Sequence, residues 1–177
     1  MTAESLYPLL VPASWFQEMA GFRGEFGHGI EMTLVEARPD CVRSITLQNV
    51  TDLGGEDLAF RTAIENLEGL AHRREVGMRM YPQGPGDQPF LLFGGHWAAA
   101  TCLLLPGLHA LASRALGTEK ICASIPHRSA MILFPEGDGG SRTAMKALIA
   151  EKESNKERPL TLELFRLMAD GVSEFRD

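Results

Sequence analysis

Apolar positions with a helical period mark the clearest element of the chain, a helix predicted over residues 56–71. Its apolar side chains repeat every three to four residues and form one stripe, made of Phe60, Ala63, Ile64, Leu67 and Leu70. Glu56 and Asp57 occupy the first turn, where the helix dipole favours negative charge, and basic residues follow Ala71. Periodicity and charge therefore agree on an amphipathic helix with one buried face.

Short apolar or alternating segments predict strands, and they come in adjacent pairs. The predicted strands cover residues 30–37, 41–50, 75–81, 90–93, 120–125 and 130–134. The segment from Leu160 onward predicts a short helix or strand followed by a hairpin around Asp170-Gly171. Residues 30–50 are expected to form one hairpin, and residues 120–134 another.

Three further segments predict helices. Residues 5–20 are expected to be helical after an early proline break, with Trp15, Phe16 and Met19 on a buried face. The apolar segment 97–116 predicts a helix that is bent or split at Pro106, because proline lacks the backbone N–H and clashes with the preceding turn. A last helix is expected to begin at Ser141 and to bury Met145, Leu148 and Ile149.

The order of these elements predicts an α+β fold. Strand pairs separated by helices are not the pattern of a repeated βαβ unit, so we expect a mostly antiparallel mixed sheet with about four helices packed mainly on one face. The 177 residues fit a single domain, residues 1–177, in which an N-terminal helical segment (1–25) packs on an α+β core.

Composition and charge narrow the classes of function. With 45% hydrophobic and 23% charged residues, the chain has the composition of a soluble globular protein. Its net charge of −6 opposes binding to nucleic-acid phosphates, so no nucleic-acid partner is expected. No apolar run is long enough to span a bilayer and no secretory signal is visible, so neither a membrane partner nor export is expected. Three widely spaced cysteines fit a reduced, cytoplasmic protein.

The most plausible binding group lies between the two strands predicted at 120–125 and 130–134. His127 and Arg128 stand in that loop, and an arginine there could bind a carboxylate or phosphate with two parallel hydrogen bonds. The alternative is that Arg128 pairs with a nearby acid or bonds backbone carbonyls to hold the turn. Arg79, Tyr81 and His96 are candidates to complete a ligand site with them. No catalytic residue is predicted, since neither Ser124 nor Ser129 lies in a nucleophile-elbow motif.

Two glycine-rich turns precede predicted helices. Gly94-Gly95 fits either an anion site at a helix N-terminus or close packing of helix on strand. The turn from Gly137 to Ser141 lacks the ending of a phosphate-binding P-loop and predicts a surface turn. The five histidines are scattered, and no metal-binding motif links them. We therefore predict no cofactor and no metal site.

Several segments together resemble a known family. They are EDLAFRTAIENLEGL, WAAATCLLLPGLHAL, ICASIPHRSAMILF and LTLELFRLMADGVSEF, spread over about residues 11–175. In order and content they are similar to the YtpQ-like DUF1444 (UPF0354) family of uncharacterised bacterial proteins. In that family the segment matching IPHRSAMILF usually reads proline, a small residue, arginine and aspartate. Here Ser129 stands where the aspartate is expected, so a role that needs a carboxylate there is not carried over. The resemblance implies no activity.

Two functions from different classes are compatible with these features. The first is a non-catalytic, cytoplasmic protein-binding protein of an adaptor, secretion-chaperone-like or immunity type, whose partner is another protein or a second copy in a homodimer. It predicts an exposed apolar patch or a dimer interface. The alternative is an enzyme or small-ligand-binding protein with a pocket near His127 and Arg128. It predicts convergent polar groups and a titrating group with a shifted pKa.

Overall fold

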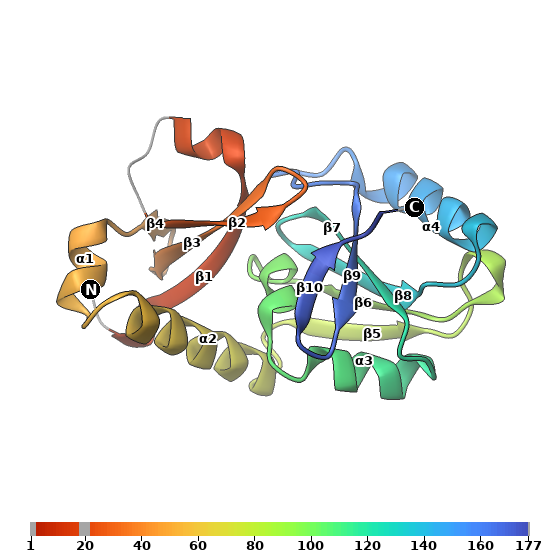
Figure 1. Cartoon of the computed structure of the whole chain (residues 1–177), viewed down its shortest axis with the longest axis horizontal. Coiled ribbons are helices and arrows are strands. Elements are labelled where there is room, and N and C mark those ends of the chain that lie inside the picture. Colours follow the sequence, from red (N-terminus) through yellow and green to blue (C-terminus); the bar gives the residue numbers. More distant parts are fainter. Residues whose placement is uncertain (1–2, 18–21, 177) are drawn as a thin grey trace. The chain divides into compact units, whose positions relative to one another are not determined.

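The computed structural model describes residues 3–17 and 22–176, which form ten β-strands, four α-helices and four short 3-10 helices (Figure 1). Contacts within the chain divide it into two compact units, Met1–Glu75 and Val76–Asp177. The described strands form two antiparallel sheets, one in each unit. The predicted α+β class is confirmed, but the strands are shared between two sheets where the sequence suggested one.

The first unit is a four-stranded sheet with helix α2 packed on strand β1. β3 is the central strand: β1 pairs along one side of it, and β2 and β4 follow one another along the other. The described elements are η1 (Ala3–Ser5), β1 (Leu6–Pro12), η2 (Ala13–Gln17), β2 (Arg23–Gly27), β3 (Ile30–Ala37), β4 (Val42–Ser44), α1 (Leu47–Asp52) and α2 (Glu56–His72).

Helix α2 confirms the prediction made from periodicity. It runs one residue beyond the predicted end, and it buries Ala63, Leu67 and Leu70 from the predicted stripe. Phe60 and Ile64 are half-buried at the margin of the stripe. The amide of Asn66 donates to the carbonyls of Ala3 (2.7 Å) and Leu6 (2.8 Å), which ties the helix to the start of the chain.

The predicted N-terminal helix is wrong over residues 6–12, which form strand β1, and only the 3-10 segment η2 at residues 13–17 is helical there. Pro8 and Pro12 explain the error. Each would break a helix interior, whereas β1 is an edge strand whose open side tolerates residues without an N–H. Trp15, predicted to be buried, is 38% exposed. Met19 lies outside the described residues.

The second strand of the predicted hairpin is much shorter than expected. β3 matches the predicted strand over Ile30–Ala37, but β4 covers only Val42–Ser44, and helix α1 replaces the rest. A capping box starts this helix: the Thr46 hydroxyl accepts from the Asn49 N–H (3.2 Å), and the Asn49 side chain accepts from the Thr46 N–H (3.0 Å). That reciprocal pair fixes the first turn where the alternating pattern suggested a strand.

The second unit contains a six-stranded antiparallel sheet with the order β10-β9-β7-β8-β6-β5 (Figure 1). β5 and β10 are its two edge strands. The described elements are β5 (Gly77–Tyr81), η3 (Pro85–Asp87), β6 (Phe90–Gly94), η4 (Ala100–Leu104), α3 (Leu108–Leu116), β7 (Ile121–His127), β8 (Ala130–Pro135), α4 (Gly139–Glu153), β9 (Leu164–Met168) and β10 (Gly171–Glu174).

Helices cover this sheet on both faces rather than mainly on one. Met145 and Ile149 of α4 pack against alternate strand residues on one face, namely Cys122, Ile132, Phe134 and Leu164. The residues between them point to the other face, where α3 packs on β6, β7 and β8 (Figure 1). The central strand β7 is therefore buried along its whole length.

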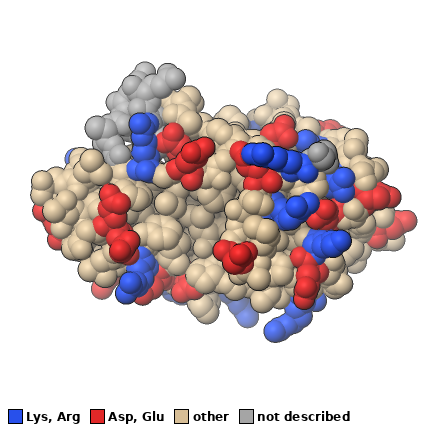
Figure 2. Space-filling model, viewed as in Figure 1, with Lys and Arg blue, Asp and Glu red and all other residues tan. Residues whose placement is uncertain are grey.

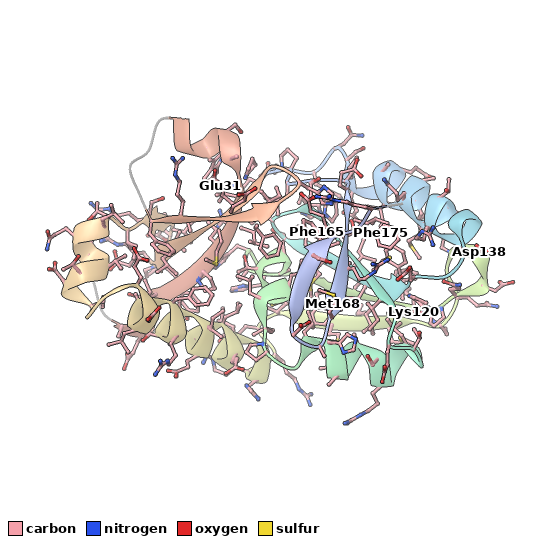
Figure 3. All side chains as sticks on the ribbon, viewed as in Figure 1. Glu31, Lys120, Asp138, Phe165, Met168 and Phe175 are labelled. Atoms are coloured by element: carbon pink, nitrogen blue, oxygen red, sulfur yellow. The ribbon has the colours of Figure 1, made fainter. Side chains whose placement is uncertain are left out.

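Most predicted elements of this unit are confirmed. Strands β7 and β8 pair as predicted, and β9 and β10 form the hairpin around Asp170-Gly171. The apolar segment is split at Pro106 into the 3-10 helix η4 and helix α3, which ends at Gly117 with the left-handed φ of 71° expected of a C-cap. Asp138 (Figure 3), and not Ser141, caps α4, because its side chain accepts from the Ser141 N–H (2.7 Å).

Charged side chains of both signs are mixed over the second unit. On the face shown in Figure 2, Lys and Arg alternate with Asp and Glu, and neither sign forms a continuous patch there. Part of this mixing is direct pairing, as between Lys146 and Glu163 (3.1 Å) and between Arg166 and Glu136 (3.1 Å). Among the described helices, none has the length and apolar character needed to cross a bilayer.

The three cysteines differ in accessibility, and this predicts a simple labelling result. Cys102 and Cys122 are fully buried, whereas Cys41 is exposed. Burial raises the pKa of the Cys102 thiol to about 12, so almost no reactive thiolate forms there near neutral pH. We expect Ellman's reagent at pH 8 to label one thiol rapidly in the native protein and three in denaturant. Rapid native labelling of a Cys41→Ser variant would contradict the buried positions.

Candidate functional site

The tip of the β7–β8 hairpin is held in place from two sides. The Arg128 N–H donates to the Arg158 carbonyl (3.1 Å), and the Arg128 carbonyl accepts from the Ala100 N–H (3.1 Å). One residue pair further on, the Leu160 N–H donates to the Pro126 carbonyl (3.0 Å). The tip is thus fastened both to η4 and to the segment that follows α4, which makes it a rigid platform for the side chains it carries.

His127 uses both ring nitrogens within the protein. Its Nε2 lies 2.9 Å from a carboxylate oxygen of Glu153, the last residue of α4, and its Nδ1 accepts from the Ser129 N–H (3.3 Å). An accepting Nδ1 carries no proton, so the neutral ring has its proton on Nε2 and donates it to Glu153. His127 therefore joins the hairpin to α4, and neither nitrogen is free to act as a general base.

Arg128 combines deep burial with the absence of an acidic partner. The residue is only 6% exposed, and its Nε–H is buried without a hydrogen-bond partner. No carboxylate among the described residues forms an ion pair with it. Its side chain lies over Trp97, whose ring centroid is 5.1 Å from the guanidinium carbon. A cation over an indole ring at this distance is favourable but does not neutralise the charge.

The electrostatic environment of Arg128 is unfavourable to its own charge. Burial, together with the positive charge of Arg158, lowers the pKa of the guanidinium to about 10. Arg158 is exposed and adopts a left-handed backbone conformation with a φ of 58°, which is uncommon outside glycine. Two guanidinium groups therefore lie near one end of the sheet, and within the described part of the chain no acid is paired with the buried one.

His96 lies close to Arg128, because both side chains contact Trp97. The rings of His96 and Trp97 have centroids 5.3 Å apart, and His96 Nδ1 accepts from the Ala98 N–H (3.2 Å). Both residues are half-buried in the turn between β6 and η4. Of the five residues proposed from sequence, the structure thus groups His96, His127 and Arg128 at one end of the sheet.

Arg79 and Tyr81 lie elsewhere on the sheet. Gly77 of β5 is level with the hairpin tip, since it pairs with Gly94, which in turn pairs with Ala130. Tyr81 is four residues further along, about 13 Å away, and its ring stacks on Phe90 with centroids 4.6 Å apart. Arg79 lies about 7 Å from Gly77 along the same strand, and β5 is separated from β8 by β6.

Three contributing residues were not singled out from sequence. Trp97 stood beside a noted histidine, but its apolar surroundings indicated core packing. Glu153 and Arg158 belong to the polar run EKESNKER, which reads as a solvated helix end. Contacts between residues far apart in the sequence bring that run to the hairpin, among them the bridge between His127 and Pro159. No local pattern encodes a pairing across 32 residues.

The other candidate sites gain no support from the structure. The helix after Gly94-Gly95 is η4, a single 3-10 segment of five residues, too short to act as an anion-binding helix N-terminus. The turn before α4 is closed by the side chain of Asp138. Ser124 is fully buried within β7, and the described residues include no cluster of three potential metal ligands.

Comparison of the chain with protein-family models, with curated proteins and with solved structures finds no match. The resemblance to the YtpQ-like DUF1444 family stays a prediction. Function is therefore argued from the geometry of the chain itself.

Proposed function

We propose that the protein binds a small ligand through an oxyanion group, a carboxylate or a phosphate, at the tip of the β7–β8 hairpin. The observation that carries the proposal is Arg128: an arginine that is only 6% exposed, whose Nε–H is buried without a partner, and which has no acidic partner among the described residues. Arg158 adds a second positive charge at the same place. Arginine is the side chain best suited to grip either anion with paired hydrogen bonds.

A bound anion would supply the negative charge that Arg128 lacks among the described residues of the folded protein. An unpaired buried charge is costly, and natural proteins seldom retain one without a counter-charge or a functional reason. A bound oxyanion would neutralise Arg128 and screen its repulsion from Arg158. Because Trp97 and the backbone anchors already hold the arginine in place, little conformational freedom would be lost on binding.

The site supports binding more directly than chemistry. A hydrolytic or proton-transfer reaction needs a base within reach of the ligand, and the ring nitrogens of His127 are both engaged. The exposed Ser129 follows Arg128, and among the described residues its hydroxyl has no hydrogen bond to a base. The arrangement is that of a recognition site in which His127 and Glu153 support the arginine's loop.

Fluorescence of Trp97 offers a direct test, because the ring touches the guanidinium that would bind the anion. The chain has only two tryptophans, so a Trp15→Phe protein reports Trp97 alone. We expect sodium phosphate or sodium acetate to change its emission saturably, beyond sodium chloride of equal ionic strength. Whichever anion binds more tightly identifies a phosphate or a carboxylate ligand. We also expect that anion to raise the melting temperature, since a ligand that binds the folded state stabilises it.

Three variants determine whether that response belongs to the proposed site. Arg128→Gln should weaken anion binding at least tenfold, and Arg158→Gln should weaken it less. Arg114→Gln on α3 removes the same charge from an exposed position and should leave binding unchanged. The proposal fails if chloride reproduces the whole response, or if Arg128→Gln binds the anion as tightly as the parent protein.

The protein-binding function expected from sequence is also a proposal, and one observation favours it. Two methionines on the edge strand β5, Met78 and Met80, are 51% and 46% exposed. Exposed large apolar side chains on an unpaired sheet edge are a feature of strands that pair with another chain.

A further inference from the structure

We propose that two copies of this chain associate through strand β5, so that the six-stranded sheets of the two copies join edge to edge into one antiparallel sheet. This inference does not depend on the oxyanion site, because β5 lies at the sheet edge and the Arg128 turn does not take part. It gives the exposed apolar strand a single defined occupant, a second β5 in antiparallel orientation.

The β5 edge has the properties of a pairing surface. Its five residues pair with β6 in one uninterrupted register, with no bulge to twist the edge away. No backbone group of residues 77–81 has a hydrogen bond beyond that ladder among the described residues. Residues Gly77 to Met80 are all exposed, and the strand carries no proline, which is a common device for blocking an edge.

The opposite edge of the same sheet is better protected. β10 has only four residues, and three of them are half-buried. The chain after β10 continues its ladder with β9 by one more rung, since the Phe175 N–H donates to the Leu164 carbonyl (2.9 Å). The Phe175 ring (Figure 3) packs against the guanidinium groups of Arg142 and Arg166, whose carbons lie 5.1 and 4.8 Å from its centroid. The β10 edge is thus short and partly buried, whereas residues Gly77 to Met80 of the β5 edge are exposed.

The side chains of β5 select one register for a second copy. Antiparallel pairing centred on Arg79 would set two guanidinium groups directly opposite each other, which is destabilising. Pairing centred on Met80 sets Arg79 of one copy opposite Tyr81 of the other, twice by symmetry. A guanidinium beside an aromatic ring is attractive. The strand is therefore self-complementary in the register centred on Met80.

The same register gathers the exposed methionines. Met78 and Met80 lie on one face of β5, because strand residues two apart share a face. In the dimer the two Met80 side chains meet at the two-fold axis, with Met78 of each copy beside them. Methionine adapts its shape readily, so these side chains can pack without a preformed socket. Arg79 and Tyr81 occupy the other face, which separates the apolar contact from the charged one.

Sedimentation velocity of the full chain over a range of concentrations tests the association. We expect a dimer that dissociates on dilution, and we expect Met80→Lys to give a monomer by placing two ammonium groups opposite each other. Met168→Lys is the matched control: Met168 (Figure 3) is an exposed methionine, 36% accessible, on β9 of the same sheet. That variant should dimerise like the parent. A monomer at every concentration, or a dimer unaffected by Met80→Lys, would overturn the proposal.

Disulfide trapping tests the register. In a Cys41→Ser background, which removes the exposed native thiol, Met80→Cys should form a covalent dimer on mild oxidation, because directly opposed Cα atoms lie about 4.5–5.5 Å apart. Arg79→Cys should not, because its two copies would be diagonal neighbours about 7–8 Å apart. The reverse result, efficient trapping at residue 79 and none at 80, would overturn the assigned register.

Discussion

Replacing Phe165 with alanine is expected to lower the free energy of unfolding by about 3–5 kcal/mol, the range for deleting a large aromatic side chain from a packed core. Phe165 (Figure 3) is among the largest fully buried side chains, and it lies on β9 between β7 and β10. Its neighbour on β7 is Ala123, which is too small to fill the space that Phe165 would leave. Equilibrium urea unfolding, followed by circular dichroism, measures the change.

Phe175→Ala provides the comparison for that measurement. Phe175 is half-buried and packs against guanidinium groups at the rim of the sheet, so its removal opens the site to water instead of creating a cavity. We expect a loss of about 1 kcal/mol, since surface-side packing contributes less than core packing. If the two variants were equally stable, Phe165 would not be the core residue that the structure shows.

The sequence predicted elements best where one physical signal dominated. Helix α2 and strand β3 were both predicted within one residue of their ends, because a regular burial pattern of 3.6 or 2 residues fixes the element type. The N-terminal strand was missed because buried leucines in β1 carry no helix or strand signature by themselves. Whether Pro8 and Pro12 break a helix or mark an edge strand depends on the neighbouring strand β3, which lies far along the chain.

Candidate site residues were predictable only in part, for a similar reason. A polar pair in a hairpin turn between apolar strands singled out His127 and Arg128, since little else in that segment can bind a ligand. The partners of that pair come from two separate segments, one at Trp97 and one that holds Glu153 and Arg158. Arg128 is informative because it lacks an acidic partner in the part of the chain that the structure describes. The sequence cannot show this, because 23 acidic residues are available in principle.

The second large effect we expect has the opposite sign: Arg128→Met should raise the free energy of unfolding by about 2 kcal/mol. Lowering the guanidinium pKa to about 10 corresponds to roughly 3 kcal/mol of unfavourable interaction in the folded state. Losing the favourable contact with Trp97 reduces this gain in stability by about 1 kcal/mol. Methionine is unbranched and flexible, so it can follow the path of the arginine stem. Removing a buried charge and replacing it with an apolar side chain often stabilises a protein.

The pH dependence of this effect has a definite sign. The folded-state pKa of Arg128 lies below its unfolded value, so the unfolded chain binds the proton more tightly and the penalty applies in full below about pH 10. The difference between Arg128→Met and the parent protein should therefore be constant from pH 6 to 9 in urea unfolding. Deprotonation of Arg128 would raise the free energy of unfolding with pH only above that pH range.

The sign of the Arg128→Met effect separates a structural role from a binding role. An arginine kept for stability would make the variant less stable, and that result would remove the physical basis for an oxyanion site. An arginine kept for binding makes the unliganded protein less stable than it could be, a common trade at functional sites. In that case the anion that binds most tightly should stabilise the parent protein and narrow its gap to the methionine variant, while leaving the variant unchanged. Melting temperatures of both proteins with and without phosphate or acetate measure that difference directly.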